Sequence, residues 1–259
     1  MLNIIKHFLS LLALTLVYCI ATGLTTNASA EEPEGWDAGL ALGVSTTSGN
    51  SETLSANASL TGTKITDKHE LRLGAEGSYA ESELEVVSDG TTNTIDETTA
   101  QNAKAYVNYK RKFGALYGYS DNSIFHDDPA AIDYRLMTGL GGGGYIIQTD
   151  STKLGIETGA TYINEELTTG EDDDYIAVRF AARHDQALSE TSKIWESLEY
   201  LPRADDWDDY LFNAEAGIEA AVNTTVSLRV VIQNRYDSEP PADIDNNDLS
   251  IIGSFVYKL

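Results

Sequence analysis

Two kinds of side chain in this sequence could do chemistry: aspartates and glutamates in dense runs, and histidines next to aspartate. The acidic runs at residues 171–174 and 205–209 offer hard oxygen atoms of the kind that bind Ca²⁺ or Mg²⁺. Neither run has the Asp-x-Asp-x-Asp-Gly spacing of a dedicated calcium loop, so we expect a solvated, self-repelling rim and keep a cation site as the alternative. The candidate metal ligands are Asp172, Asp173, Asp174, Asp205, Asp206 and Asp208.

The histidine motifs are His126-Asp127-Asp128 and His184-Asp185. Activation of a water molecule by a histidine would need its aspartate partner to face a second pair of carboxylates. Asp205 and Asp206 could lie opposite His126, whereas His184 has no serine beside it. Because a His-Asp dipeptide arises often by chance, we expect no enzymatic activity and no cofactor, and a hydrolase at the rim of a barrel is the less favoured alternative.

The elements that would position these residues are β-strands. From Trp36 onward, apolar and polar residues alternate with period two, which places successive side chains on opposite faces of a strand. The pattern recurs to the last apolar face, which ends at Leu259, and it is weaker over residues 116–125 and 193–202. The chain is therefore predicted to form about twelve strands and no helical bundle.

The connections between these strands alternate in length. The tight set comprises residues 66–68, 112–114, 148–152, 188–192 and 223–225. The second set is longer and acidic, at residues 81–99, 126–132, 164–174, 204–209 and 237–247, with a short member at 48–51. Outer-membrane barrels have short periplasmic turns and longer extracellular loops. This alternation predicts an all-β protein: a closed, antiparallel, up-and-down transmembrane β-barrel.

The two faces of the strands differ in charge. The apolar face is almost free of charged residues and carries aromatic residues near strand ends, as expected where it meets hydrocarbon and the bilayer interface. The other face mixes both signs of charge with many glycines, which we expect to make space in a polar lumen. The residues expected to face the lumen are Arg72, Glu76, Lys104, Arg135, Glu157, Arg179, Arg183, Glu215, Glu219, Arg229 and Arg235.

The first thirty residues have the pattern of a secretory signal peptide. Lys6 precedes an apolar run from Phe8 to Ala21, and Ala28-Ser29-Ala30 is a small-residue cleavage site. We therefore expect a signal peptide at residues 1–30, cleaved after Ala30, and a barrel domain at residues 31–259. The one cysteine, Cys19, lies in that signal segment, which excludes a disulfide framework from the mature chain. The net charge of −24 makes nucleic acid an improbable partner.

Two segments carry a resemblance to a known family. Residues 36–43 (WDAGLALG) followed by 47–53 (TSGNSET), and residues 133–135 (DYR) leading into 139–145 (GLGGGGY), resemble the YdiY-like or salt-induced outer-membrane proteins, the DUF481 family. The resemblance covers nearly the whole mature chain. It implies the outer membrane of a Gram-negative cell and a salt response, and no assigned enzymatic activity. The last five residues are similar to the alternating signal that the outer-membrane assembly machinery recognises, with Leu259 where phenylalanine is commoner.

Two functions are open at this point. One is a narrow polar pore for small solutes or ions, which would prefer cations because of its acidic mouth. The other is a non-conducting structural or salt-stress barrel with cation-binding extracellular loops. The expected partners are outer-membrane lipid, lipopolysaccharide, the assembly machinery and divalent cations.

Overall fold

The computed structural model describes residues 35–48, 53–88 and 91–259, with residues 53, 81–88 and 91–100 described by their backbone alone. The predicted signal peptide and its cleavage site lie outside the described residues, as do residues 49–51 of the first predicted connection. Among the described residues, no helix is long and apolar enough to cross a membrane.

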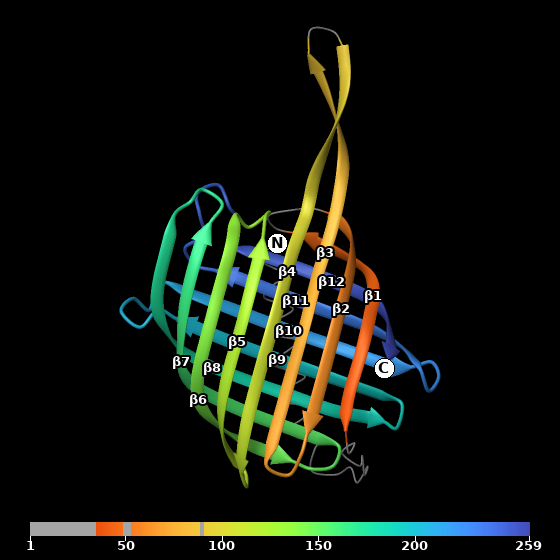
Figure 1. The fold of residues 1–259 in the computed structure, drawn as a ribbon, viewed down its shortest axis with the longest axis vertical. Coiled ribbons are helices and arrows are strands. Elements are labelled where there is room, and N and C mark those ends of the chain that lie inside the picture. The colour runs from red at the N-terminus through yellow and green to blue at the C-terminus, as the bar shows by residue number, and fades with distance from the viewer. Residues whose placement is uncertain (1–34, 49–52, 89–90) are drawn as a thin grey trace.

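The described part of the chain forms twelve antiparallel strands that close into one barrel (Figure 1). Each strand pairs with its neighbours in the sequence, and the first strand pairs with the last, which confirms the predicted architecture. The weakly patterned segments at residues 116–125 and 193–202 are both strands. The strands are β1 (Trp36–Ser48), β2 (Thr53–Ile65), β3 (His69–Ser88), β4 (Thr91–Phe113), β5 (Leu116–Asp127), β6 (Ile132–Gln148), β7 (Thr152–Leu167), β8 (Asp172–Ser189), β9 (Ser192–Pro202), β10 (Tyr210–Ala221), β11 (Val226–Asp237) and β12 (Asn247–Lys258).

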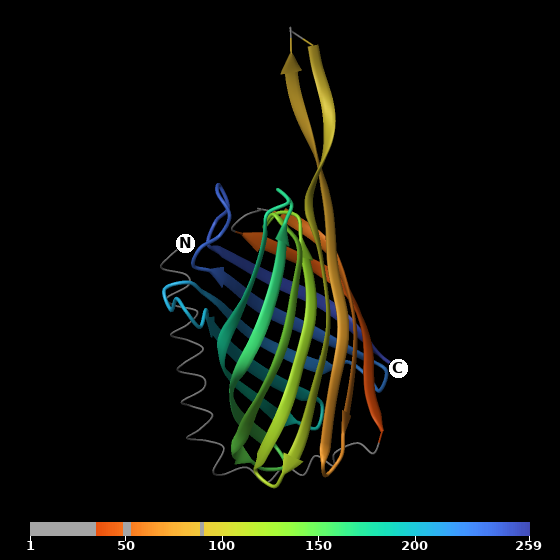
Figure 2. The same ribbon diagram turned by 60° about the vertical axis from the view of Figure 1, so that its left-hand side comes forward.

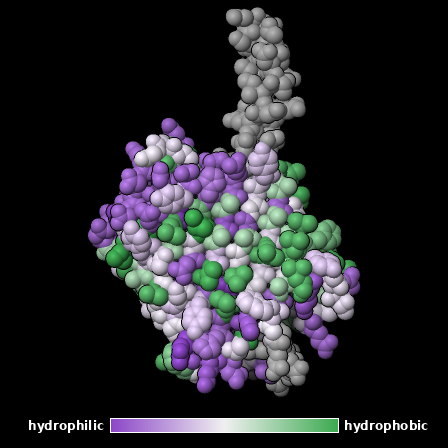
Figure 3. Space-filling model, viewed as in Figure 1, coloured by the Kyte–Doolittle hydropathy of each residue, from purple (hydrophilic) through white to green (hydrophobic). Residues whose placement is uncertain are grey.

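The outer wall of the barrel is apolar across its middle. Large hydrophobic side chains at alternate strand positions are exposed, among them Leu42, Leu140, Ile176 and Phe255. Figure 3 shows hydrophobic side chains across the middle of the visible wall and hydrophilic ones toward the two ends. Because period two sends neighbouring side chains to opposite faces, the polar residues between them point inward.

The closing seam joins β1 and β12 from Gly39↔Lys258 to Ser48↔Leu249. The backbone N–H of Leu259 also donates to the carbonyl of Ala38 at 2.9 Å. The closure leaves no unpaired edge along the seam, which a β-structure in lipid requires.

The β3–β4 hairpin projects far beyond the rim (Figures 1 and 2). Its backbone pairing continues from Glu81↔Thr98 to Ser88↔Thr91, after an irregularity between Ala80 and Glu81 at the rim. The predicted loop at residues 81–99 is therefore wrong, because both strands continue as a paired ribbon. We call this end of the barrel the hairpin end, and the opposite end, with the short turns, the turn end.

Aromatic rings fill space that the inward glycines leave free. A Cβ at Gly74 would lie 2.7 Å from the Tyr106 ring, and one at Gly143 would lie 2.7 Å from the Tyr117 ring. The rings of Tyr119 and Trp195 stand over other glycines in the same way. The prediction that these glycines open the lumen is therefore wrong at those positions, since each accommodates a ring.

Candidate functional site

The lumen is identified by ion pairs between strands that lie far apart around the barrel. Arg72 of β3 lies 3.9 Å from Asp185 of β8, and Arg135 of β6 lies 3.0 Å from Asp237 of β11. In a closed barrel such contacts can only pass through the interior. The candidate site is therefore the charged lining of the lumen.

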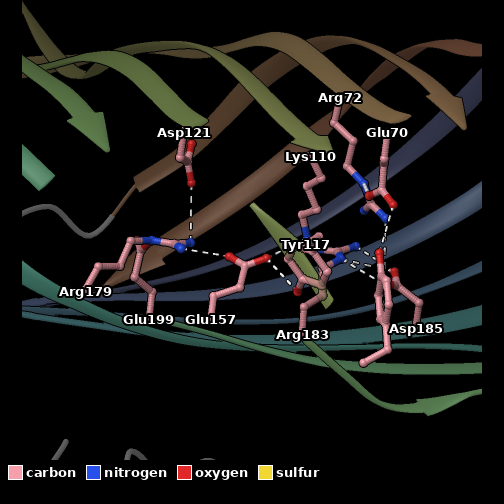
Figure 4. A network of polar contacts seen from close by, with 11 residues as sticks. Glu70, Arg72, Lys110, Tyr117, Asp121, Glu157, Arg179, Arg183, Asp185 and Glu199 are labelled. Atoms are coloured by element: carbon pink, nitrogen blue, oxygen red, sulfur yellow. Dashed lines mark hydrogen bonds and ion pairs between the residues drawn. The ribbon is translucent and has the colours of Figure 1, made fainter. Parts of the chain in front are cut away.

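Glu157 is the centre of the first group of contacts (Figure 4). Its carboxylate accepts from Lys110 Nζ at 2.6 Å, Arg179 Nη1 at 2.7 Å and the Tyr117 hydroxyl at 3.0 Å. Arg179 also contacts Glu199 at 2.6 Å and Asp121 at 3.4 Å. We call these six residues the Glu157 cluster; they come from β4, β5, β7, β8 and β9 and cross the lumen.

The second group lies beside the first and has Asp185 and Glu70 as its acids (Figure 4). It is near the turn end, where β3 begins at His69 and β8 ends at Ser189. Arg183 binds Asp185 at 2.8 Å, and Arg72 binds Glu70 at 2.7 Å. The Tyr145 hydroxyl donates to Glu70 at 3.2 Å. We call these five residues the Asp185 cluster. Arg183 and Asp185 are 34% and 35% exposed although they lie inside the barrel, so there is space for water beside them in this part of the lumen.

A third set of charges lies at the hairpin end. Arg135 binds Glu165 as well as Asp237, and Arg235 lies 3.5 Å from Asp127 on the far wall. Asp127 and Arg235 line a cavity of about 30 Å³, together with Asp248. A cavity of that size holds about two water molecules.

Near the turn end, Trp195 and its neighbours form a fourth set. The Trp195 indole N–H donates to Glu215 at 2.6 Å, and the Arg229 guanidinium lies 5.7 Å from the ring. Arg229 binds Glu219 at 2.7 Å, and Lys193 approaches Glu219 at 3.6 Å.

The residues predicted from the sequence to face the lumen divide into two groups in the structure. The first group takes part in ion pairs and comprises Arg72, Arg135, Glu157, Arg179, Arg183, Glu219, Arg229 and Arg235. The second group makes other contacts: Glu215 accepts hydrogen bonds from Trp195 and Gln233. Lys104 lies 6.0 Å from the Tyr106 ring, and its pairing partner across β3 is Glu76.

The selection of lumen residues missed several members of these clusters. Glu70 and Lys110 share the polar face of their strands with Arg72 and Lys104, so alternation could have found them. Asp121 and Glu199 lie on the two poorly patterned strands, where alternation assigns no face. Their partnership with Arg179 depends on barrel closure, for which the sequence contains no local signal.

One part of the lumen is apolar. Ile163, Ala177 and Leu201 are fully buried and pack with Leu211. Met137 and Tyr175 lie against them. This packing lies inside the barrel between β6 and β10, so the lumen is not polar throughout.

The candidate metal ligands do not gather around one point. Asp172, Asp173 and Asp174 belong to strand β8, where a loop had been predicted. Arg203 lies between acids at this rim: it binds Asp173 at 2.6 Å, Asp205 at 3.2 Å and Asp209 at 3.6 Å. The side chain of Asp206 accepts from the backbone N–H of Asp208. Within the described residues, no group of three or more histidines or acids could hold a metal ion.

The rim arginine and its acids shift each other's protonation. The hydrogen bond that Arg203 donates to Asp173 raises the pKa of Arg203, with further support from the charges of Asp173, Asp205 and Asp209. Burial raises the pKa of Asp209, and Glu239 adds to this effect while Arg203 opposes it. Arg203 therefore stays charged, and its ion pairs hold the connection at residues 204–209 against β8.

The histidines lie apart from the lumen clusters. His126 Nδ1 lies 2.7 Å from the carbonyl of Asp133, and its Nε2 lies 3.4 Å from Asp128. Its neighbour Asp127 faces Arg235 across the lumen, so the two adjacent side chains point to opposite faces of β5. His184 lies 3.3 Å from Glu196 on the outer side of β8 and β9, away from Asp185.

Comparison with known proteins supports the fold. The family model described as "Protein of unknown function, DUF481" matches residues 40–259. The NanC porin is similar with a TM-score of 0.54 and 10% identity, over 85% of this chain and 100% of that chain. The KdgM porin in complex with disordered oligogalacturonate has a TM-score of 0.47 and 11% identity, over 85% of this chain and 99% of that chain. No curated protein matches. The likeness to NanC shows a porin-like barrel fold.

Proposed function

The chain belongs to the DUF481 family, whose model it matches over residues 40–259, and we propose that it is an outer-membrane barrel that forms a narrow, polar, cation-preferring pore for small solutes or ions. The observation that carries the proposal is a charged lumen with space for water. Arg183 and Asp185 remain about one-third exposed between the walls of the barrel.

The outer wall supports the membrane location. Its middle is apolar, and an aromatic ladder runs over β8 to β11 near the hairpin end. Ring centroids are 6.5 Å apart for Phe180 and Tyr200, 5.2 Å for Tyr200 and Tyr210, and 5.6 Å for Tyr210 and Tyr236. Aromatic residues favour the bilayer interface, where one edge of the ring is wet. In this orientation the hairpin end is extracellular and the turn end is periplasmic.

The balance of charge in the lumen supports a preference for cations. Each arginine of the lumen clusters has a carboxylate partner, so the guanidinium groups offer no free site for an anion. At the hairpin end, Arg135 and Arg235 face three acids, Glu165, Asp237 and Asp127. An acidic mouth raises the local concentration of cations.

The direct test is conductance in planar bilayers with the refolded barrel. We expect small unitary currents in KCl, and a reversal potential in a KCl gradient that has the sign of a cation-selective pore. Unitary currents with anion preference would refute the selectivity, and folded protein without unitary currents would refute the pore.

A second function has one specific observation in its favour. The cavity at the hairpin end is only about 30 Å³, and the ion pairs of the Glu157 cluster span the lumen below it. A barrel that is fully blocked there would strengthen the envelope under salt stress without conducting. Slower growth of a deletion strain in high salt, restored equally by wild-type protein and by a lumen variant that does not conduct, would favour this function.

The proposal also covers export, partners and chemistry. It includes cleavage of a signal peptide after Ala30, insertion by the outer-membrane assembly machinery, and contact with lipopolysaccharide at the hairpin end. Divalent cations would bind the acidic rim diffusely, since Arg203 already lies between Asp173 and Asp205. We propose no enzymatic activity, because His126 and Asp127 face opposite sides of β5.

A further inference from the structure

The Glu157 cluster crosses the lumen between several strands, and its three central charged side chains are nearly buried. The side chains of Lys110, Glu157 and Arg179 are 9%, 8% and 9% exposed. We propose that this cluster is the constriction of the barrel and that Glu157 sets its charge selectivity. This inference rests on the proposed pore function.

Glu157 holds two cations at once. Its Oε1 accepts from Lys110 and Tyr117, and its Oε2 accepts from Arg179. Lys110 comes from β4 and Arg179 from β8, on either side of Glu157 in β7. Without the Glu157 carboxylate, the positive charges of Lys110 and Arg179 would face each other across the constriction. Only Asp121 and Glu199 would then balance them.

The charge count of the cluster gives the sign of the selectivity. Lys110 and Arg179 are positive, while Asp121, Glu157 and Glu199 are negative, so two positive charges against three leave a net charge of −1. Asp121 and Glu199 are 29% and 25% exposed, so the excess negative charge lies on the wetter side of the cluster. A passing cation would meet these two carboxylates.

This arithmetic predicts an ordered series of variants. Lys110→Gln leaves a net charge of −2, Glu157→Gln leaves zero, and the double variant restores −1. One charge about 6 Å from a passing ion changes its occupancy by about threefold to tenfold. Because the same charge acts with opposite sign on K⁺ and on Cl⁻, the permeability ratio of K⁺ to Cl⁻ should change by about the square of that factor, roughly tenfold to a hundredfold. It should rise by this amount in Lys110→Gln and fall by this amount in Glu157→Gln. The double variant should return close to the wild-type ratio.

A matched control is Glu219→Gln. Glu219 also lies between an arginine and a lysine in the lumen, at 2.7 Å from Arg229 and 3.6 Å from Lys193. Lys193 is half-exposed, so mobile ions screen this site near the turn end. We expect less than half of the effect of Glu157→Gln on the logarithm of the permeability ratio.

The experiment measures reversal potentials of all five proteins in a KCl gradient, after heat-modifiable migration on a gel has shown that each is folded. The ordered series supports the inference. A conducting Glu157→Gln barrel with the wild-type ratio, or an equal effect of Glu219→Gln, would overturn it and leave the pore intact. If Glu157→Gln does not fold, Lys110→Gln is compared with wild type: a higher ratio of K⁺ to Cl⁻ permeability supports the inference, and an unchanged ratio overturns it.

Two further outcomes separate the inference from the proposed function. A silent wild type beside a Glu157→Gln barrel that conducts without a preference for cations would refute the native pore and support the role of Glu157. Folded proteins without conductance throughout the series would overturn both.

Discussion

The fit of Trp195 against Gly217 gives the sharpest test of the packing inside the barrel. Gly217 of β10 pairs with Trp195 of β9, and a Cβ added at Gly217 would overlap the indole ring. The ring is held by the hydrogen bond from its N–H to Glu215 and by the guanidinium of Arg229. Gly217→Ala therefore forces the ring away from both partners.

The cost has two parts. Overpacking of one methyl group against a fixed ring costs about 1–3 kcal/mol. Loss of a hydrogen bond to a charged acceptor costs about 1.5–3 kcal/mol. Because a small rotation of the ring can relieve part of each, we expect Gly217→Ala to lower the free energy of unfolding by about 3 kcal/mol.

The assay is urea-induced unfolding of the barrel refolded in lipid vesicles, followed by tryptophan fluorescence and by near-ultraviolet circular dichroism. Gly253→Ala is the control, because a Cβ at Gly253 has nothing within 4 Å. Its effect should stay within about 0.5 kcal/mol. In a Trp195→Ala background, the cost of Gly217→Ala should disappear, since the two positions are in contact. If Gly217→Ala unfolds like Gly253→Ala, the reasoning about the inward rings is wrong.

Three other predictions concern the outer wall and the rim. Leu140→Arg places a charge midway along the lipid-facing side of β6 and should lower the free energy of unfolding in vesicles by about 2–4 kcal/mol; an unchanged value would contradict a bilayer around this wall. The folded barrel binds the proton of Asp209 more tightly than the unfolded chain, because the pKa of Asp209 is raised. Its contribution to stability is therefore present below the ordinary aspartate pKa of about 3.9 and is lost as pH rises through the raised value. As pH rises from about 4 to neutrality, the free energy of unfolding measured by urea titration should fall less in Asp209→Asn than in wild type. Equal falls in the two proteins would refute the raised pKa of Asp209. Calcium titration calorimetry should give no more heat than magnesium, because Arg203 lies between Asp173 and Asp205; a stoichiometric calcium signal would show a dedicated site.

Strand positions and the outward face were predictable because period two is a local property of the sequence. It places Leu140 and Phe255 on the wall even without knowledge of their neighbours. The two ambiguous strands have a physical reason for their weak signal. Tyr117 and Tyr119 of β5, and Trp195 and Leu201 of β9, point inward, so apolar side chains occupy both faces there.

The partners of the lumen charges were beyond sequence reasoning. Arg72 and Asp185 are far apart in the chain and meet only because the sheet closes. The alternation of β3 and β4 also cannot show where the barrel ends, since the same backbone pairing continues past Ala80 into the projecting hairpin. The glycines were recognised as inward, but the rings that occupy their space come from the neighbouring strands.

The seam between β1 and β12 makes the starting point of the chain structurally arbitrary. It has the same antiparallel hydrogen bonding as the other strand pairs, and Leu259 lies within a hydrogen bond of Ala38. A short linker could join these two points, and a new chain end could be opened at a turn such as that between β10 and β11, to give a circular permutant with every strand pair intact. Removal of β12 has no such remedy, because it leaves both β11 and β1 with a free edge that favours aggregation.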